Sequence, residues 1–230
     1  MDEQFNSAVT DIFRNEYLSP RSPYTTLQIP KQGIGEWCHP LHTVDIDDSG
    51  LRSSVQKGVL NTKLGVPFRT PAEGQNIAFT SLWDNYPDSL TVSLKGKASR
   101  AYLLMAGSTN HMQCHIDNGL IRVYYKDGTC DKMALRNPDN WAPIEHIFFE
   151  DDLAFNRHAP ALYRLRLKTG EISNNFGEEL GFPGASRELD GGAAILLEMP
   201  LNPDKKLSHL VLETLSNDVV IGLMGITLQR

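Results

Sequence analysis

The residues best suited to chemistry in this sequence are a group of histidines and one cysteine. The stretch "AGSTNHMQCHIDNGLIRVYYKDG", Ala106–Gly128, places His111, Cys114 and His115 within five positions. Imidazole and thiolate are the usual ligands of zinc, and imidazole also serves as a general acid or base. The first question is whether these side chains meet at one site or lie on opposite faces of a strand.

Alternation along this segment separates Cys114 from His115. In a strand, successive side chains point to opposite faces of the sheet. Cys114 is then a small buried hydrophobe that reacts slowly, and His115 lies on the polar face. The apolar face would be made by Met112, Cys114 and Ile116, and the polar face by His111, Gln113, His115 and Asp117. The sequence therefore predicts no transition metal bound jointly by His111, Cys114 and His115.

A second cluster, "CHPLH", offers Cys38, His39 and His42. Together with His111 or His115 it has the ligand types for a zinc site. Structural zinc sites usually show ligand pairs at tight spacing, such as Cys-x₂-Cys with His-x₃₋₅-His. Neither cluster has that spacing, so we expect loop histidines and a polar strand face instead, with no metal and no other cofactor.

The stretch "DIDDSG" resembles the first half of a calcium-binding loop. Asp45, Asp47, Ser49 and Gly50 match its first ligand positions, but Gln56 stands where the loop needs a bidentate glutamate. Flanking helices are also missing from the pattern. A polar turn is the favoured interpretation, and a lone structural calcium ion on these oxygens remains an alternative.

Familiar catalytic motifs are absent from the sequence. It has no G-x-S-x-G elbow, no P-loop and no G-x-G-x-x-G. Loop carboxylates could supply the pair that a glycoside hydrolase needs, although an acidic protein carries such residues by chance. They are Asp84, Asp88, Glu145, Glu150, Asp151, Asp152, Glu178 and Glu179.

Two loops have the composition of a sugar-binding site. Such a site needs an exposed aromatic ring to stack on a pyranose and planar polar groups to bind hydroxyls. The first loop, "LWDNYPDS", offers Trp83, Asp84, Asn85 and Tyr86. The second, "RNPDNWAPIEHIFFEDDLAFNRH", offers Asn137, Asn140, Trp141, Glu145, His146, Arg157 and His158. The alternative is that these aromatic residues only cap the end of a sandwich.

Composition limits the other classes of function. The chain has 230 residues, with 22 basic and 28 acidic side chains and a net charge of −6. An acidic protein without a basic stripe is a poor partner for nucleic acid. No apolar run approaches the roughly 20 residues that span a bilayer, and the first twenty residues do not resemble a signal peptide. We therefore expect neither a nucleic-acid nor a membrane partner.

Short β-rich runs separated by turns dominate the chain from residue 43 onward. The clearest is "GLIRVYYKDGTCDKMALR", in which two runs meet at Asp127–Gly128, a favoured hairpin turn. Residues 8–17 predict one short amphipathic helix, followed by an irregular Pro- and Gly-rich segment. The predicted organisation is an N-terminal arm over residues 1–42 and an all-β sandwich over residues 43–230.

The part of the sequence from residue 43 onward resembles the accessory β-sandwich modules of bacterial glycan-degrading proteins, which have a galactose-binding-domain-like jelly-roll fold. The likeness covers about residues 43–230. It rests on "GVPF" at Gly65–Phe68, "NIAFTS" at Asn76–Ser81, "YPDSLTV" at Tyr86–Val92, "AYLLMAG" at Ala101–Gly107 and "NDVVIGLMGITL" at Asn217–Leu228.

The resemblance implies a jelly-roll sandwich that sits beside a catalytic domain in a larger exported protein, in the periplasm or outside the cell. The leading expectation is a non-catalytic module that binds carbohydrate through Trp83, Asp84, Tyr86, Asn137, Asn140, Trp141, Glu145, His146 and Arg157. Two alternatives are a structural domain that braces its neighbour without binding sugar, and a small glycan hydrolase that uses loop carboxylates.

Overall fold

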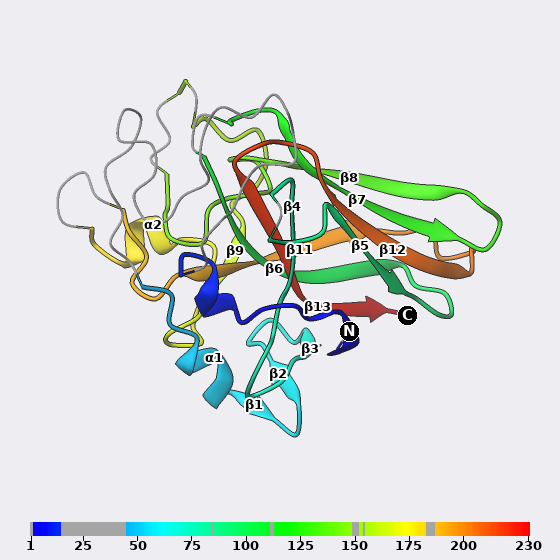
Figure 1. Cartoon of the computed structure of the whole chain (residues 1–230), viewed down its shortest axis with the longest axis horizontal. Coiled ribbons are helices and arrows are strands. Elements are labelled where there is room, and N and C mark those ends of the chain that lie inside the picture. Colours follow the sequence, from blue (N-terminus) through cyan, green and yellow to red (C-terminus); the bar gives the residue numbers. More distant parts are fainter. Residues whose placement is uncertain are drawn as a thin grey trace.

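Two antiparallel sheets form the body of the protein (Figure 1). The computed structural model describes residues 2–14, 45–83, 85–110, 113–148, 152–153, 155–182 and 187–230. The larger sheet has six strands, in the order β10 (Ile172–Ser173), β9 (Tyr163–Arg166), β11 (Ala193–Pro200), β6 (Arg100–Thr109), β13 (Val219–Gln229) and β4 (Ala78–Ser81). The smaller has four, in the order β5 (Ser89–Ser93), β12 (Leu207–Thr214), β7 (Asp117–Tyr125) and β8 (Cys130–Arg136).

Short elements complete the chain. A three-stranded sheet is formed by β1 (Val55–Gln56), β2 (Val59–Asn61) and β3 (Pro67–Arg69), and it lies with the helix α1 (Ser49–Ser53) below the main sheets in Figure 1. A second short helix, α2 (Phe176–Glu179), lies at the left of that view, and the turn between β7 and β8 lies at the right. The predicted all-β sandwich is confirmed; the jelly-roll order of strands stays a prediction.

The hairpin at Asp127–Gly128 forms as its turn residues predict. β7 and β8 pair in antiparallel register, and Tyr124 lies opposite Cys130. The Asp127 side chain accepts a hydrogen bond from the Thr129 amide at 3.0 Å, and Gly128 has a φ of 85°, a conformation that glycine adopts without strain. Along β7, Ile121 and Val123 are fully buried, which is the period of two that the sequence predicts.

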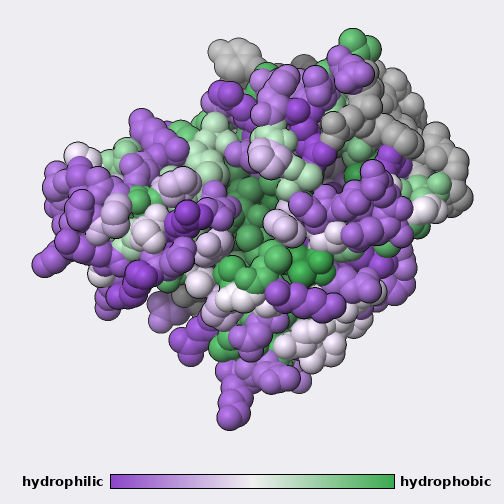
Figure 2. All heavy atoms as spheres, turned by 180° about the vertical axis from the view of Figure 1, so that it is seen from behind, coloured by the Kyte–Doolittle hydropathy of each residue, from purple (hydrophilic) through white to green (hydrophobic). Residues whose placement is uncertain are grey.

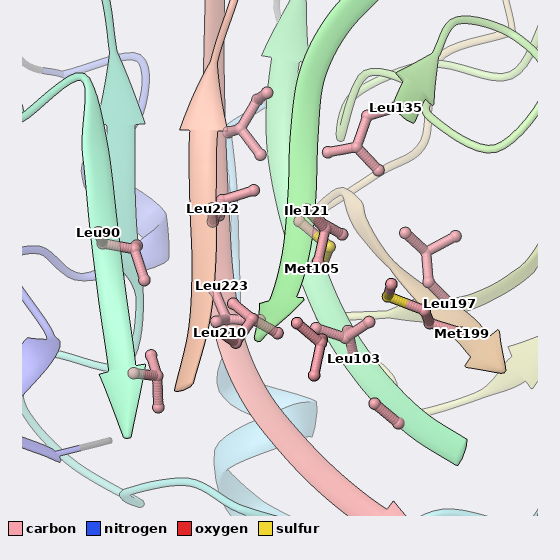
Figure 3. Packing of buried hydrophobic residues seen from close by; sticks show 14 of the residues in the cluster. Leu90, Leu103, Met105, Ile121, Leu135, Leu197, Met199, Leu210, Leu212 and Leu223 are labelled. Carbon is pink, nitrogen blue, oxygen red and sulfur yellow. The ribbon is translucent and has the colours of Figure 1, made fainter. Parts of the chain in front are cut away.

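The main core lies between the two large sheets. Leucine, methionine and isoleucine side chains from both sheets point toward one another there (Figure 3). They include Leu103 and Met105 of β6, Ile121 of β7, and Leu210 and Leu212 of β12. At roughly 25 cal/mol for each Å² of apolar surface removed from water, this interface is the chief source of the sandwich's stability.

A second core covers the outer face of the six-stranded sheet. Leu104 and Ala106 of β6 face it, and so do Leu60 of β2 and Phe68 of β3. The central strands of this sheet are therefore buried on both faces, which explains why "LLMAGST" of β6 is buried without interruption. Leu51 of α1 closes the same core.

The N-terminal residues belong to this second core. Val9 and Ile12 are buried in it, and the side-chain amide of Asn6 donates to the Phe79 carbonyl at 2.9 Å. The sequence predicted a helix over residues 8–17, whereas the described part contains one 3₁₀ turn, Val9–Asp11. The rest of the predicted arm, including Cys38, His39 and His42, lies outside the described residues.

The molecular surface is mixed. Seen from behind, hydrophobic side chains gather near the middle of the face and hydrophilic side chains surround them (Figure 2). Within the described parts of the chain, none of the helices has the length and apolar character needed to cross a lipid bilayer.

Candidate functional site

A pocket of about 360 Å³ opens beside α2, and it is formed by segments far apart in sequence. One wall comes from residues 138–148 after β8, and a second from residues 155–162 before β9 together with Arg164 of that strand. The third comes from residues 173–178, which connect β10 to α2, together with Arg187. Loops carried on a rigid sandwich are where binding residues are usually found.

Two phenylalanine rings form the aromatic part of the pocket. Phe148 and Phe155 are stacked, with ring centroids 4.3 Å apart and an angle of 10° between the ring planes. The imidazole of His146 makes an edge contact with the Phe148 ring, with ring centroids 5.2 Å apart. Leu162 and Phe176 add aliphatic and aromatic surface to the lining. The pocket therefore offers an apolar wall against which a flat apolar face can pack.

Amides and a carboxylate belong to the wall formed by residues 173–178, and they are held in place by their own hydrogen bonds. Asn175 donates from its side chain to Glu178 at 2.9 Å, and its backbone N–H donates to the Ser173 hydroxyl at 2.9 Å. That hydroxyl donates in turn to Glu179 at 2.8 Å. Asn174 is exposed beside them. This turn presents planar hydrogen-bonding groups in a fixed arrangement.

Three arginines are among the residues that line the pocket: Arg157, Arg164 and Arg187. Arg187 donates to the Gly177 carbonyl at 2.8 Å and stacks on the Phe182 ring at 5.1 Å. Burial lowers the pKa of Arg187 from its ordinary value. The charge remains, because an arginine pKa starts so far above neutrality.

Arg164 is the residue that fixes the first wall. Its guanidinium donates to the carbonyls of Pro143 at 2.7 Å, His146 at 2.6 Å and Ala193 at 3.0 Å. Burial lowers the pKa of Arg164 to about 10, so the group is still charged at neutral pH. One buried cation thus ties the 143–146 loop to β11.

Glu145 lies on the same loop but points into the protein. It is 4% exposed and accepts a hydrogen bond from the Ser108 hydroxyl at 2.9 Å. Burial raises its pKa to about 7, and the Ser108 hydrogen bond and the charge of Arg164 oppose that rise. Glu145 therefore supports the loop. The sequence had predicted that it binds the ligand, but it does not line the pocket.

The tryptophan loops differ from expectation in their burial. Trp141 is 0% exposed and Trp83 is 4% exposed, so neither ring presents a face to a sugar. Tyr86 is also buried and packs against Phe79 at 5.1 Å. These aromatic residues cap the cores, which was the alternative interpretation of the same loops. Asp84 lies outside the described residues.

The polar residues predicted for the second loop mostly support its backbone. Asn140 accepts from the Arg136 amide at 2.7 Å and donates to the Ala134 carbonyl at 2.8 Å. Asn137 is fully buried and donates to the Cys114 sulfur at 3.5 Å. Among the predicted site residues that the structure describes, Arg157 is the one that lines the pocket.

Sequence reasoning missed most of the pocket because its parts are distant along the chain. Phe148 and Phe155 belong to the second loop predicted to bind sugar, but the prediction named Trp141 as its aromatic residue. Asn174 and Asn175 form a polar pair in "ISNNFGEE", a stretch that matches no binding motif. An aromatic pair spaced seven residues apart in one long loop was the available signal.

The segment around Cys114 is not the strand that alternation predicted. β7 begins at Asp117, and Cys114 makes a single bridge to Asn137. Ile116 is 49% exposed and Cys114 is only half-buried, so the expected apolar face is wrong. A positive φ of 55° at His115 breaks the extended backbone. His111 and Met112 lie outside the described residues.

The "DIDDSG" stretch forms the start of α1. Asp47 accepts a hydrogen bond from the Ser49 amide at 2.9 Å, which lowers the pKa of Asp47. Asp48 accepts hydrogen bonds from Arg52 at 2.8 Å and from Asn76 at 2.8 Å. These contacts fit the favoured interpretation of a polar turn, here one that opens a helix.

Comparison with known proteins finds no matching family model, no matching curated protein and no matching solved structure.

Proposed function

We propose that this chain is a non-catalytic carbohydrate-binding module of a larger exported glycan-processing protein, and that its ligand enters the pocket beside α2. The observation that carries the proposal is the combination, in one pocket of about 360 Å³, of an aromatic pair, side-chain amides and guanidinium groups. That volume lies within the range of small-molecule sites, about 300–1,000 Å³, and is enough for a short saccharide segment.

The two kinds of wall suit the two kinds of surface on a sugar ring. The C–H face of a pyranose packs on an aromatic ring, which Phe148 and Phe155 supply. Hydroxyl groups around the ring edge require hydrogen-bond donors and acceptors in fixed positions. The side-chain amides of Asn174 and Asn175 each carry a donor and an acceptor. The hydrogen bond from Asn175 to Glu178 holds this wall before a ligand arrives, which reduces the entropy lost on binding.

The charge of the pocket favours an acidic saccharide. Arg157, Arg164 and Arg187 line it, and Glu178 is the carboxylate among the described lining residues. Arg164 is engaged with backbone carbonyls and with the buried Glu145, so Arg157 and Arg187 are the cations that a ligand would meet. This local excess of positive charge contrasts with the net charge of −6 for the chain. Guanidinium binds carboxylate and sulfate groups strongly. A glycan that carries uronic acid or sulfate groups is therefore the preferred ligand class.

The distribution of carboxylates supports binding without hydrolysis. A glycosidase needs two carboxyl groups about 5–10 Å apart, one on each side of the scissile bond. Glu145 is buried against Ser108, and Glu179 is held by the Ser173 hydroxyl. That leaves Glu178, bonded to Asn175, as the carboxylate of the described pocket wall; Glu150 and Asp151 lie outside the described residues.

The test is a binding screen of the purified chain against neutral, uronic-acid-containing and sulfated oligosaccharides, followed by calorimetry on the best ligand. We expect weak binding, with a dissociation constant of roughly 10⁻³ to 10⁻⁵ M. Phe155→Ala should weaken it by about tenfold or more, since the stacking surface is lost. Arg157→Gln should weaken binding of acidic ligands more than of neutral ones.

Tyr163→Ala is the matched control, because Tyr163 is a surface aromatic residue, 40% exposed, that does not line the pocket. It should leave affinity unchanged. The proposal is overturned if no saccharide binds at millimolar concentration, which would favour a structural domain that braces its neighbour. It is also overturned if Phe155→Ala and Tyr163→Ala behave alike.

A further inference from the structure

Three side chains that the pocket does not use converge beside it. One ligand atom from each of His115, Asp139 and His158 lies within 4.8 Å of the other two. Nδ1 of His158 is 3.6 Å from Oδ1 of Asp139, and Nδ1 of His115 is 3.9 Å from Oδ2 of the same carboxylate. The two imidazole rings are tilted by 48° to each other, with centroids 5.0 Å apart.

We propose that His115, Asp139 and His158 form a binding site for one divalent transition-metal ion of the zinc type. Bonds of about 2.0–2.2 Å to a tetrahedral ion place two ligand atoms about 3.4 Å apart. The separations of 3.6 and 3.9 Å around Asp139 exceed this by half an ångström or less. These two separations join different oxygens of Asp139, and the three ligand atoms together lie within 4.8 Å of one another. Side-chain rotations that bring them closer by up to about 1.4 Å are therefore needed for all three to bind one ion.

Backbone contacts hold the three residues in place. The His158 amide donates to Oδ1 of Asp139 at 2.8 Å, and the His115 amide donates to the Asn137 carbonyl at 2.7 Å. His115 has a φ of 55°, which few residues with a side chain adopt. This backbone turns the imidazole toward Asp139 instead of leaving it on a strand face. Such strained positions gather at functional sites.

The two ring nitrogens of His115 have different surroundings. Nδ1 faces Asp139 and is the ligand atom of the proposed site, whereas Nε2 is buried and has no hydrogen-bond partner among the described residues. The Asp139 side chain is 19% exposed, and its ion pairs within the described chain are with the two histidines. Arg136, three residues before Asp139, is paired with Asp117 and also interacts electrostatically with Asp139. A half-buried carboxylate between two imidazoles attracts a cation.

The ligand set selects the class of metal. Imidazole suits zinc, copper, nickel and iron, whereas calcium and magnesium prefer sites made of oxygen ligands. Three protein ligands leave a coordination position for water. The His158 side chain is 65% exposed, so an ion can enter from the solvent side.

The proposed ion lies next to the wall of the pocket. Asp139 follows Pro138, and His158 follows Arg157, and both of those preceding residues line the pocket. A bound ion would therefore join the 137–140 loop to the 155–158 segment, two pieces of chain that approach the pocket from different directions. This inference does not depend on the nature of the pocket's ligand.

The test is calorimetric titration of the purified, tag-free chain with Zn²⁺ alone in metal-free buffer, with elemental analysis of the loaded protein. We expect one ion per chain and a dissociation constant of roughly 10 µM or lower. His158→Ala and Asp139→Asn should each weaken binding by at least about tenfold, the loss that removal of even an outer partner of a metal site produces. Ca²⁺ in tenfold excess should not compete.

His209→Ala is the control for histidine content, because His209 stacks on Tyr124 at 4.7 Å on the four-stranded sheet and is not part of the cluster. It should bind zinc like the unaltered chain. Asp139→Asn keeps an acceptor for the His158 amide, so this variant decides the matter if His158→Ala fails to fold. The proposal is overturned if no stoichiometric zinc binds, or if binding survives in Asp139→Asn at unchanged affinity.

Discussion

The indole ring of Trp141 lies directly on the backbone of β6 at Gly107. A Cβ atom at Gly107 would stand 2.8 Å from Cη2 of Trp141 and 2.0 Å from the Val220 carbonyl oxygen. Three residues after Trp141, the Ile144 amide donates to the Gly107 carbonyl at 2.7 Å. The loop after β8 is therefore packed onto the larger sheet, and this contact positions the first wall of the pocket.

Trp141→Ala should destabilise the protein strongly. The side chain is fully buried in the core between the sheets, and deletion of a buried aromatic ring costs about 3–5 kcal/mol. Urea denaturation followed by circular dichroism would measure the loss. Tyr163→Ala, which removes a half-exposed ring, should cost far less, and equal stability of the two variants would contradict the packing described here.

Gly107→Ala should also destabilise the fold, by about 1–3 kcal/mol or more, since the added methyl group overpacks the contact. Trp141→Phe should not rescue it, because the Val220 carbonyl still blocks the new Cβ. A double-mutant cycle on thermal stability tests this. Full rescue by the smaller ring would mean that the indole, and not the neighbouring strand, excludes a side chain at residue 107.

Glu145 should make stability depend on pH. Its pKa is raised from 4.5 to about 7 in the folded protein, so the folded state holds a proton that the unfolded state releases. The stability that the protein has with Glu145 protonated is fully present below pH 4.5, and it is lost as the pH rises to about 7. At pH 8 the cost of ionising the buried group is about 3 kcal/mol.

Glu145→Gln should therefore raise the stability above that of the unaltered chain at pH 8. At pH 5 the gain should be smaller, because Glu145 is then protonated in the folded protein. Glutamine keeps an acceptor for the Ser108 hydroxyl and carries no charge. Asp218 acts in the same direction, since burial raises its pKa to about 6, and Asp218→Asn serves as a second case. Melting temperatures between pH 4.5 and 8 would test this; parallel profiles for Glu145→Gln and the unaltered chain would contradict it.

Arg164→Lys should loosen the loop that carries the pocket wall. A single ammonium group cannot reach the carbonyls of Pro143, His146 and Ala193 at once. Each hydrogen bond lost between the charged group and a carbonyl costs about 1.5–3 kcal/mol. Arg100→Lys is the surface control, because Arg100 pairs with Glu198 at a half-exposed position and should change stability by less than about 0.5 kcal/mol. Hydrogen exchange at residues 143–146 would report the loosening directly.

Local pattern was enough to predict the class of fold and some of its parts. The Asp127–Gly128 hairpin, and the alternation of Ile121, Val123 and Tyr125, follow from turn chemistry and from the two-residue period of a strand. Both depend on neighbours within a few residues. The all-β sandwich follows from many such short runs with turns between them.

The candidate sites depend on contacts that no local pattern records. Trp141 is buried because Gly107 leaves room for its ring on a strand more than thirty residues away, and alternation failed at residues 113–116 because His115 takes a positive φ. The pocket brings Phe148 and Phe155 to Asn174 and Asn175, and His115 meets His158 across forty-three positions. Side-chain type sets what each residue can do; long-range packing of the chain decides which residues share a site, because burial and proximity are properties of the whole fold.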